Sequence, residues 1–269
     1  MDRSKWIAIT HRPSSRLDQC ELTHVGRIPI DIELAMEQHD AYCAALEGAG
    51  CEVRRYDFNQ AFADAAFVED VAVVLDDLIV MGAMGVKSRQ QESIGWRARL
   101  SEFGEVVELP TGATLEGGDV LRVGRDLYIG ASSRTNKQAL EAVADIVGRL
   151  GYAVHSIPVR GCLHLKTACT ALDDETLLVN PQWLDVDSLP KSKRIIADDA
   201  WGANIVRLPD RILANAQNRA TIEQLDGLGY TVSSVDLSEF AKAEAGPSCL
   251  SLLIGRLPRF TTKHTKHTK

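Results

Sequence analysis

The sequence predicts an α/β fold in which five near-equal units close into a ring. A pattern of strand, arginine, helix and strand recurs three times in the 269 residues. An apolar hairpin segment precedes each pattern, which makes the unit ββαβ. The unit starts lie 46, 48, 40 and 45 residues apart, near Asp70, Glu116, His164, Asn204 and Cys249. The same pattern leaves an ordinary open α/β sheet as the alternative.

The first elements along the chain form an incomplete unit. An apolar strand at residues 5–10 and a helix at 33–48 have no hairpin of their own. Because Cys249 begins a unit near the other end of the chain, we expect the two ends to share one unit. A ring closed in this way has no exposed sheet edges.

The recurring units follow in order. The first has strands at 67–75, 78–82 and 105–110 with a helix at 90–103, and the second has strands at 114–123, 127–130 and 153–158 with a helix at 136–150. The hairpin segment 164–172 and the elements at 212–215, 220–228 and 231–235 continue the pattern. Apolar residues at helical spacing predict one buried face for the helix at 136–150, formed by Leu140, Val143, Ala144, Val147 and Leu150.

Composition favours one globular domain at 1–260, followed by a polar, repetitive and disordered tail at 261–269. Hydrophobic residues make up 45% of the chain, and no Pro/Gly/Ser linker divides it. The net charge of -7 argues against nucleic-acid and membrane partners and suits a cationic small molecule. We expect a cytoplasmic protein, since the sequence lacks a signal-like or membrane-spanning apolar run. A homodimer is compatible with this sequence.

Four unit starts carry chemistry-bearing side chains: Asp70, Glu116, His164 and Cys249. In a ring of equivalent units these residues converge on the axis. Paired carboxylates fit the planar fork of a guanidinium, and a thiol with an imidazole suits covalent catalysis. Taken singly, a cysteine or a histidine is more often a structural core residue, so the equivalence of the four positions carries the functional interpretation.

Two further motifs leave alternatives open. Gly117 and Gly118 after Glu116 permit close backbone approach to a ligand, or form a tight turn. Arg89 and Arg134 could bind a carboxylate, or be solvated charges at helix starts, which the pattern alone slightly favours. The six cysteines show neither zinc-type spacing nor a disulfide framework, so we expect no metal and no cofactor.

Five motifs together resemble the dimethylarginine dimethylaminohydrolases of the guanidino-modifying enzyme superfamily. They are Phe67-Val68-Glu69-Asp70, Leu115-Glu116-Gly117-Gly118-Asp119, Arg134-Thr135-Asn136, His164-Leu165-Lys166 and Ser248-Cys249. The resemblance runs from about His11 to Leu253. It implies a five-bladed pseudosymmetric α/β propeller built of ββαβ repeats, and a cysteine hydrolase that converts methylated arginines to citrulline.

The resemblance also implies roles for individual residues. Cys249 matches the nucleophile, and His164 the general acid and base. Glu116 and Asp70 match the carboxylates that hold the guanidinium. We expect Glu116 to be catalytic, together with Cys249 and His164, and Asp70 to bind substrate. The residues expected to bind the amino-acid end of a guanidino amino acid, or to close over it, are Arg89, Arg134, Asp64, Glu244 and Leu17.

Two departures from the family pattern concern substrate fit. Residues 81–86 replace the Arg-Pro-Gly-Ala stretch that is common in the family, and Glu244 stands where an aspartate is usual. Alternative functions are an arginine deiminase or another guanidine hydrolase, and a non-catalytic propeller that acts as a binding module.

Overall fold

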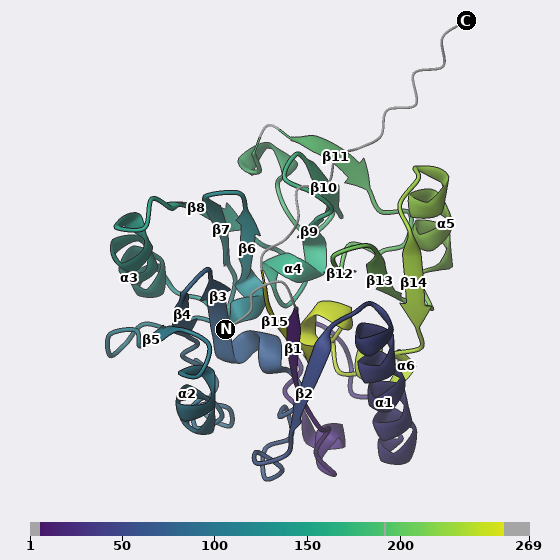
Figure 1. The fold of residues 1–269 in the computed structure, drawn as a ribbon, viewed down its shortest axis with the longest axis horizontal. Coiled ribbons are helices and arrows are strands. Elements are labelled where there is room, and N and C mark those ends of the chain that lie inside the picture. Colours follow the sequence, from purple (N-terminus) through teal and green to yellow (C-terminus); the bar gives the residue numbers. More distant parts are fainter. Residues whose placement is uncertain (1–5, 191, 256–269) are drawn as a thin grey trace, which may run out of the picture.

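Five small sheets arranged around a central axis make up the fold. The computed structural model describes residues 6–190 and 192–255. Each of the five sheets has three strands, and Figure 1 shows them around a common centre with α1, α2, α3 and α5 at the periphery. The predicted ring of five units is confirmed, and the open-sheet alternative is wrong. The predicted tail at 261–269 lies outside the described residues.

Four blades come from consecutive segments of the chain. Blade 1 contains β3 (Ala72–Leu75), β4 (Leu78–Met81), α2 (Ile94–Leu100) and β5 (Glu105–Val107). Blade 2 contains β6 (Val120–Val123), β7 (Asp126–Ala131), α3 (Lys137–Gly148) and β8 (Ala153–Pro158). Blade 3 contains β9 (Cys169–Ala171), β10 (Thr176–Val179) and β11 (Lys193–Ile196). Blade 4 contains β12 (Val206–Arg207), β13 (Ile212–Asn215), α5 (Arg219–Gly227) and β14 (Val232–Val235).

Blade 5 joins the two ends of the chain, as the sequence predicts. It contains β15 (Leu252–Ile254), β1 (Ile7–His11), α1 (Ile32–Gly48) and β2 (Glu52–Tyr56). Strand β1 pairs antiparallel with β15 and parallel with β2. The other four blades repeat this antiparallel and then parallel pairing, so all five blades share one topology.

A short helical turn precedes the first strand in four of the blades. These turns are η2 (Val68–Val71), η3 (Gly117–Asp119), α4 (Leu165–Ala168) and η5 (Pro247–Leu250). The first strands β3, β6, β9, β12 and β15 lie nearest the centre in Figure 1. The residues that begin each repeat therefore share one end of the inner strands.

Blade 3 departs from the ββαβ prediction. The chain between β10 and β11 contains only the 3-10 turn η4 (Val186–Ser188) among its described residues. The stretch 180–192 contains prolines and acidic residues and lacks a helical apolar period. Helix α2 is also shorter than the predicted 90–103.

Helix α3 shows how one blade is built. Asn136 caps its start, because the side-chain oxygen accepts a hydrogen bond from the Ala139 amide at 2.9 Å. Val143 and Val147 are buried as predicted, and Ala139 completes the buried face. The prediction for Leu150 is wrong, because this residue lies beyond the helix end and is 46% exposed.

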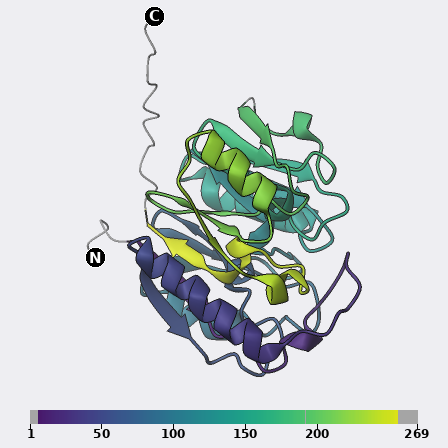
Figure 2. The same cartoon turned by 90° about the vertical axis from the view of Figure 1, so that its right-hand side faces the viewer.

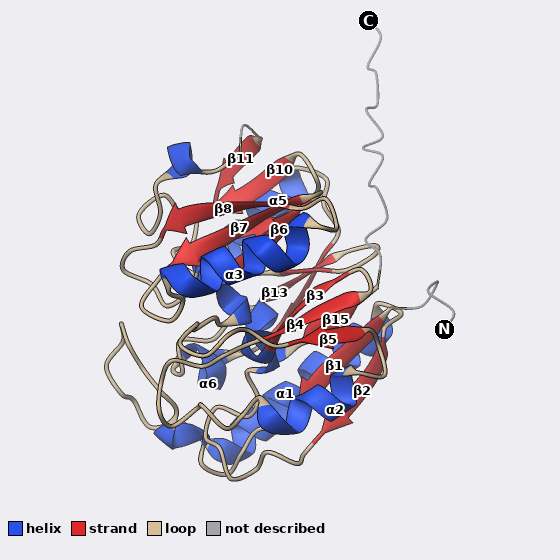
Figure 3. Cartoon of the chain, turned by 90° about the vertical axis from the view of Figure 1, so that its left-hand side faces the viewer, coloured by secondary structure: helices blue, strands red, loops and turns tan. Residues whose placement is uncertain are grey.

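The hydrophobic core lies between blades rather than within them. One cluster joins Leu75 and Val80 of blade 1 to Leu127 and Val143 of blade 2, and four further clusters fill the other interfaces. Figures 2 and 3 view the molecule from opposite sides, and in each view helices lie on the outside of the strands. Since each blade buries its apolar face only against its neighbours, the ring holds its central side chains in fixed positions. No described helix is both long and apolar enough to cross a membrane.

Candidate active site

The turns before the inner strands bring the predicted catalytic residues together. Asp70 lies in η2, Glu116 directly precedes η3, His164 precedes α4, and Cys249 lies in η5. Turn η2 packs against both η3 and η5, and α4 packs against η3. Four positions that are far apart in the chain thus meet at one end of the ring, as the repeat predicts.

A buried histidine between two carboxylates forms the centre of the site. His164 Nε2 lies 2.8 Å from Glu116 Oε2, and His164 Nδ1 lies 3.8 Å from Asp70 Oδ1. Burial alone would lower the pKa of His164, but Asp70, Glu116 and Asp119 outweigh it and raise the pKa to about 9. The imidazole is therefore protonated at neutral pH and available as an acid.

The two glycines of the Leu115–Asp119 motif let blades 1, 2 and 3 meet. A Cβ on Gly118 would lie 2.6 Å from His164 Nδ1 and 2.9 Å from Asp70 Oδ1. A Cβ on Gly117 would lie 2.1 Å from the Glu69 carbonyl oxygen. The Gly118 amide also donates to Asp70 Oδ1 at 3.2 Å. The glycines form the 3-10 turn η3 and allow close approach of Asp70, His164 and the Glu69 backbone from the neighbouring blades, while their approach to a ligand stays a prediction.

Asp119 positions the histidine, although the sequence does not single it out as a site residue. Its Oδ1 accepts a hydrogen bond from the Leu165 amide at 3.0 Å, and its Oδ2 accepts from Ser132 and Thr135. The carboxylate thereby fixes the start of α4, directly after His164. Its place in the glycine motif is visible in the sequence, but its partner in blade 3 is not.

Cys249 lies on η5, partly exposed, while Ser248 beside it is held from two sides. Ser248 Oγ donates to Glu69 Oε2 at 2.7 Å, and Asn204 Nδ2 lies 3.1 Å from Ser248 Oγ. Desolvation, Glu69 and Asp70 raise the pKa of the Cys249 thiol to about 12. The thiol is therefore protonated at neutral pH unless a cation lies beside it.

Arg89 is buried among carboxylates. It is 2% exposed, and its Nη1 lies 2.9 Å from Asp70 Oδ2 and 3.6 Å from Glu116 Oε2. Its Nη2 lies 3.0 Å from Glu92 Oε2, a buried partner that the sequence does not reveal. Burial outweighs the Arg89 charge and raises the pKa of Glu92 to about 7. The solvated interpretation of Arg89 is wrong, and its guanidinium lies beside both carboxylates expected to hold a ligand guanidinium.

Arg134 links the reactive centre to the loop at 20–31. Its Nη1 lies 3.2 Å from Glu116 Oε1, and its Nη2 donates to Thr23 Oγ1 at 3.0 Å. At 4% exposure, Arg134 is not a solvated charge either. It connects Glu116, the partner of His164, to a segment that belongs to blade 5.

Asp64 and Glu244 hold the same loop by its backbone. Asp64 accepts from the Glu21 amide at 3.2 Å. Glu244 accepts from the Thr23 and His24 amides at 2.6 and 2.5 Å. The φ of Glu244 is 57°, in the left-handed region that few non-glycine residues adopt. Both side chains predicted to contact an α-amine thus hold the backbone of the 20–31 loop, and their contact with a ligand stays a prediction.

Leu17 lies three residues before that loop. It belongs to the 3-10 turn η1 (Leu17–Gln19), is fully buried, and packs in the cluster that Cys249 also contacts. The structure therefore places Leu17 in the same cluster as Cys249, and its closing over a ligand stays a prediction.

The site contains a group of side chains that could bind a metal. Single ligand atoms of Asp70, Glu116 and His164 lie within 4.8 Å of one another. Arg89 already pairs with Asp70 and Glu116, and His164 in its protonated form is a poor metal ligand. These surroundings disfavour a divalent metal ion.

Comparison with known proteins agrees with this geometry. Residues 60–205 match the family model described as arginine deiminase. The dimethylarginine dimethylaminohydrolase of Streptomyces coelicolor is 36% identical over 252 residues, covering 93% of this chain and 97% of that relative. The Pseudomonas aeruginosa enzyme, solved as a cysteine-to-serine variant with citrulline, superposes with a TM-score of 0.85 at 28% identity, covering 93% and 99% of the two chains.

A second solved structure contains a covalently bound ligand. It is a histidine-to-glycine variant of dimethylarginine dimethylaminohydrolase as an adduct with S-methyl-L-thiocitrulline. The two structures superpose with a TM-score of 0.84 at 27% identity, and the match covers 91% of this chain and 98% of the other chain.

Proposed function

The chain belongs to the dimethylarginine dimethylaminohydrolase family, and on that premise we propose which residues carry its reaction. It is a hydrolase that converts Nω-methylated arginines to citrulline and dimethylamine or methylamine through a covalent cysteine intermediate. The non-catalytic alternative is set aside on these grounds. The observation that best supports our residue assignment is the His164–Glu116 hydrogen bond of 2.8 Å, packed beside Asp70 and the turn of Cys249.

Cys249 is the nucleophile in this proposal. In the substrate-free protein Glu69 and Asp70 hold its proton on. A guanidinium bound beside Asp70 brings positive charge to the thiol and favours the thiolate. Deprotonation then accompanies binding, with the thiol proton released to solvent because His164 is already protonated. The thiolate attacks the guanidino carbon to give a tetrahedral adduct.

His164 moves the protons. Because its pKa is raised to about 9, it begins as imidazolium and gives its proton to the departing amine. The C–N bond breaks and a thiouronium remains on Cys249. Neutral His164 then takes a proton from water, the hydroxide attacks the same carbon, and the C–S bond breaks to release citrulline. Glu116 keeps the ring oriented and stabilises its charged form.

The loop end of the site binds the amino-acid part of the substrate. We assign the α-carboxylate to Arg134 and Arg89, and the α-amine to Asp64 and Glu244. Arg89 can join Arg134 only by giving up its contacts with Asp70 and Glu116 at the reactive end. Both carboxylates and Arg134 already bind the 20–31 loop. Substrate therefore shares these contacts with the loop or replaces them. Leu17, which lies just before the loop, moves with it over the substrate.

The test is a side-by-side assay of citrulline release from dimethylarginine, monomethylarginine and arginine. We expect the two methylated substrates to be preferred. Arginine deimination is the second candidate, because the matched family model carries that description; a kcat/KM highest for arginine would favour it. Release of dimethylamine, methylamine or ammonia, measured in the same reactions, identifies the broken bond.

We also infer a single catalytic domain at 1–260 and a cytoplasmic location, and a homodimer is compatible with both. Five inter-blade clusters without a break support one domain. Six free cysteines suit a reducing compartment. Sedimentation of the purified chain tests the dimer, and cell fractionation tests the location.

A further inference from the structure

Arg89 lies where the proposed reaction places the substrate guanidinium. Its Nη1 is 2.9 Å from Asp70 Oδ2 and 3.6 Å from Glu116 Oε2, the two carboxylates assigned to that group. Asp70 Oδ1 already accepts a hydrogen bond from the Gly118 amide. A substrate that pairs with Asp70 therefore competes with Arg89 for Oδ2, because both present the same charge and the same planar fork.

Glu92 holds the opposite edge of the Arg89 guanidinium. Glu92 Oε2 accepts hydrogen bonds from Arg89 Nε at 3.1 Å and from Nη2 at 3.0 Å, and both side chains are 2% exposed. The backbone of Glu92 is held in turn, since Asn59 Nδ2 donates to its carbonyl oxygen at 2.9 Å. Glu92 thus fixes the Nε and Nη2 edge of Arg89 and leaves Nη1 to the reactive carboxylates.

Arg89 also lies beside the loop end of the site. Its Nε is 3.9 Å from Asp64 Oδ1, and Asp64 holds the backbone of the 20–31 loop. The hydroxyl of Ser88, the preceding residue, donates to Glu21 of the same loop. The guanidinium therefore stands between the carboxylates of the reactive end and the groups assigned to the amino-acid part of the substrate.

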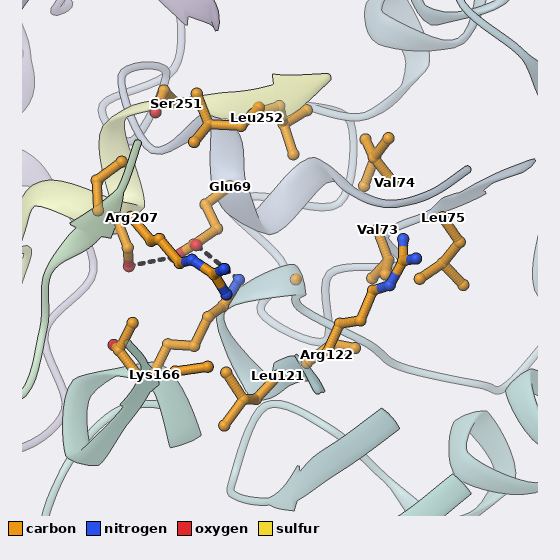
Figure 4. Close-up of a pocket in the computed structure, with 18 of the residues that line it drawn as sticks. Glu69, Val73, Val74, Leu75, Leu121, Arg122, Lys166, Arg207, Ser251 and Leu252 are labelled. Atoms are coloured by element: carbon orange, nitrogen blue, oxygen red, sulfur yellow. Dashed lines mark hydrogen bonds and ion pairs between the residues drawn. The ribbon is translucent and has the colours of Figure 1, made fainter. Parts of the chain in front are cut away.

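The neighbouring carboxylate Glu69 has a different cation. Although it precedes Asp70 in the chain, its Oε1 pairs with Lys166 Nζ at 2.6 Å, as Figure 4 shows. Asp70 and Glu92 instead share Arg89. Because these groups are buried, removing Arg89 from Asp70 is unfavourable unless another cation replaces it there and another anion meets Arg89.

Given the proposed function, we propose that Arg89, anchored by Glu92, occupies the guanidinium site until a ligand offers it a carboxylate in exchange. The substrate guanidinium takes Asp70 Oδ2, and Nη1 of Arg89 turns to the substrate α-carboxylate. Glu92 keeps the other edge of Arg89 in both states, which makes it a positioning residue. An alkylguanidine has no carboxylate to exchange, so Arg89 excludes it and selects guanidino amino acids.

Calorimetric titration of the full-length Cys249→Ser protein with butylguanidine tests the exchange without turnover. We expect weak binding to this parent, and about tenfold or more tighter binding after Arg89→Met, because Asp70 is then free of Arg89. Methylarginine should respond in the opposite direction and bind less tightly, since its α-carboxylate loses a partner. An arginine that only bound the α-carboxylate would leave butylguanidine binding unchanged.

Arg97→Met is the matched control. Arg97 lies on α2 and pairs with Glu108 at 3.0 Å on the surface, so its removal should alter the binding of neither ligand. If Arg89→Met fails to fold because Glu92 is left buried without its cation, Arg89→Met combined with Glu92→Gln removes the pair as a unit. The double variant should also bind butylguanidine more tightly than the parent.

Glu92→Gln, with Cys249 intact, tests the anchoring. KM for methylarginine should rise about tenfold while kcat stays within about twofold, because Arg89 is held less well but the reactive groups are untouched. Butylguanidine should still bind weakly, since Arg89 remains beside Asp70. Glu108→Gln is the control and should change none of these values. A fall in kcat at unchanged KM, or tighter butylguanidine binding, would contradict a positioning role for Glu92.

Failure of the exchange is distinguishable from failure of the proposed function. A wild type that releases no citrulline from methylated arginines would contradict the proposed function, and this inference with it. Normal citrulline release, together with butylguanidine binding no tighter in the folded Arg89 variants than in the parent, would overturn the exchange alone.

Discussion

The two ends of the catalytic site differ in what holds their side chains. At the reactive end, Asp70, Glu116 and His164 contact one another from short turns packed between blades. At the loop end, Asp64 and Glu244 accept hydrogen bonds from backbone amides of the 20–31 loop. The reactive end is therefore preorganised, and we propose that the loop end exchanges its contacts when a ligand arrives.

Arg134 belongs to both ends of the catalytic site. It contacts Glu116 on one side and Thr23 of the loop on the other. We expect changes at the reactive end to lower kcat and changes at the loop end to raise KM. Substitutions at each end test this division.

The largest effect is expected from Cys249→Ser. A serine hydroxyl is far harder to deprotonate than a thiol, and His164 is already protonated. Turnover should fall by more than about a thousandfold, measured as citrulline formation, while circular dichroism shows an unchanged fold. Near-normal activity in the folded variant would remove Cys249 from the mechanism.

Glu116→Gln should have the next largest effect. Removing the carboxylate leaves His164 less well oriented and less basic, so kcat should fall about a hundredfold or more. In the wild type, activity should decline above about pH 9 as His164 loses its proton. Because Glu116 raises the pKa of His164, the variant's decline should begin at lower pH. A decline at the same pH in both proteins would argue against this role.

Arg134→Ala should mainly raise KM. If the α-carboxylate contact forms equally in ground and transition states, its loss weakens binding without slowing chemistry. One charge-assisted contact is worth about 1.5–3 kcal/mol, which corresponds to a KM increase of roughly ten- to a hundredfold. Arg219→Ala is a suitable control, since Arg219 occupies the equivalent repeat position at the start of α5. A purely kcat effect in Arg134→Ala would place this arginine at the reactive end.

The smallest effect is expected from metal removal. A chelator should leave activity unchanged, because the proposed steps use only protein side chains. Added zinc should inhibit, by binding the Cys249 thiolate and neutral His164. Loss of activity to the chelator, with recovery on adding a metal, would reassign the Asp70, Glu116 and His164 group as a metal site.

The reactive end is predictable from the sequence because it repeats. Asp70, Glu116, His164 and Cys249 occupy equivalent positions before four of the five inner strands, and a ring brings equivalent positions together. The same repeat predicts closure of blade 5 from both chain ends, which pairing of β1 with β15 confirms. The missing helix of blade 3 escapes prediction, because a unit start near His164 does not determine the structure of the segment after β10.

The supporting residues are not predictable in the same way, because their partners come from other blades or depend on burial. Glu92 contacts Arg89 within one turn, yet only burial of both makes the pair part of the site. Asn204 begins the fourth repeat in the sequence, but its bond to Ser248 in blade 5 requires the folded ring. Local patterns specify elements and repeats, whereas such contacts depend on how blades pack.

One measurement tests the division between the two ends most directly. It compares kcat/KM for methylarginine and for its decarboxylated analogue in the wild type, Arg134→Ala and Asp70→Asn. We predict that Arg134→Ala loses most of the preference for the amino acid, since only that substrate has the α-carboxylate. Asp70→Asn should be slow with both substrates and keep the wild-type preference, because both carry the guanidinium. Full discrimination in Arg134→Ala, or lost discrimination in Asp70→Asn, would contradict the account.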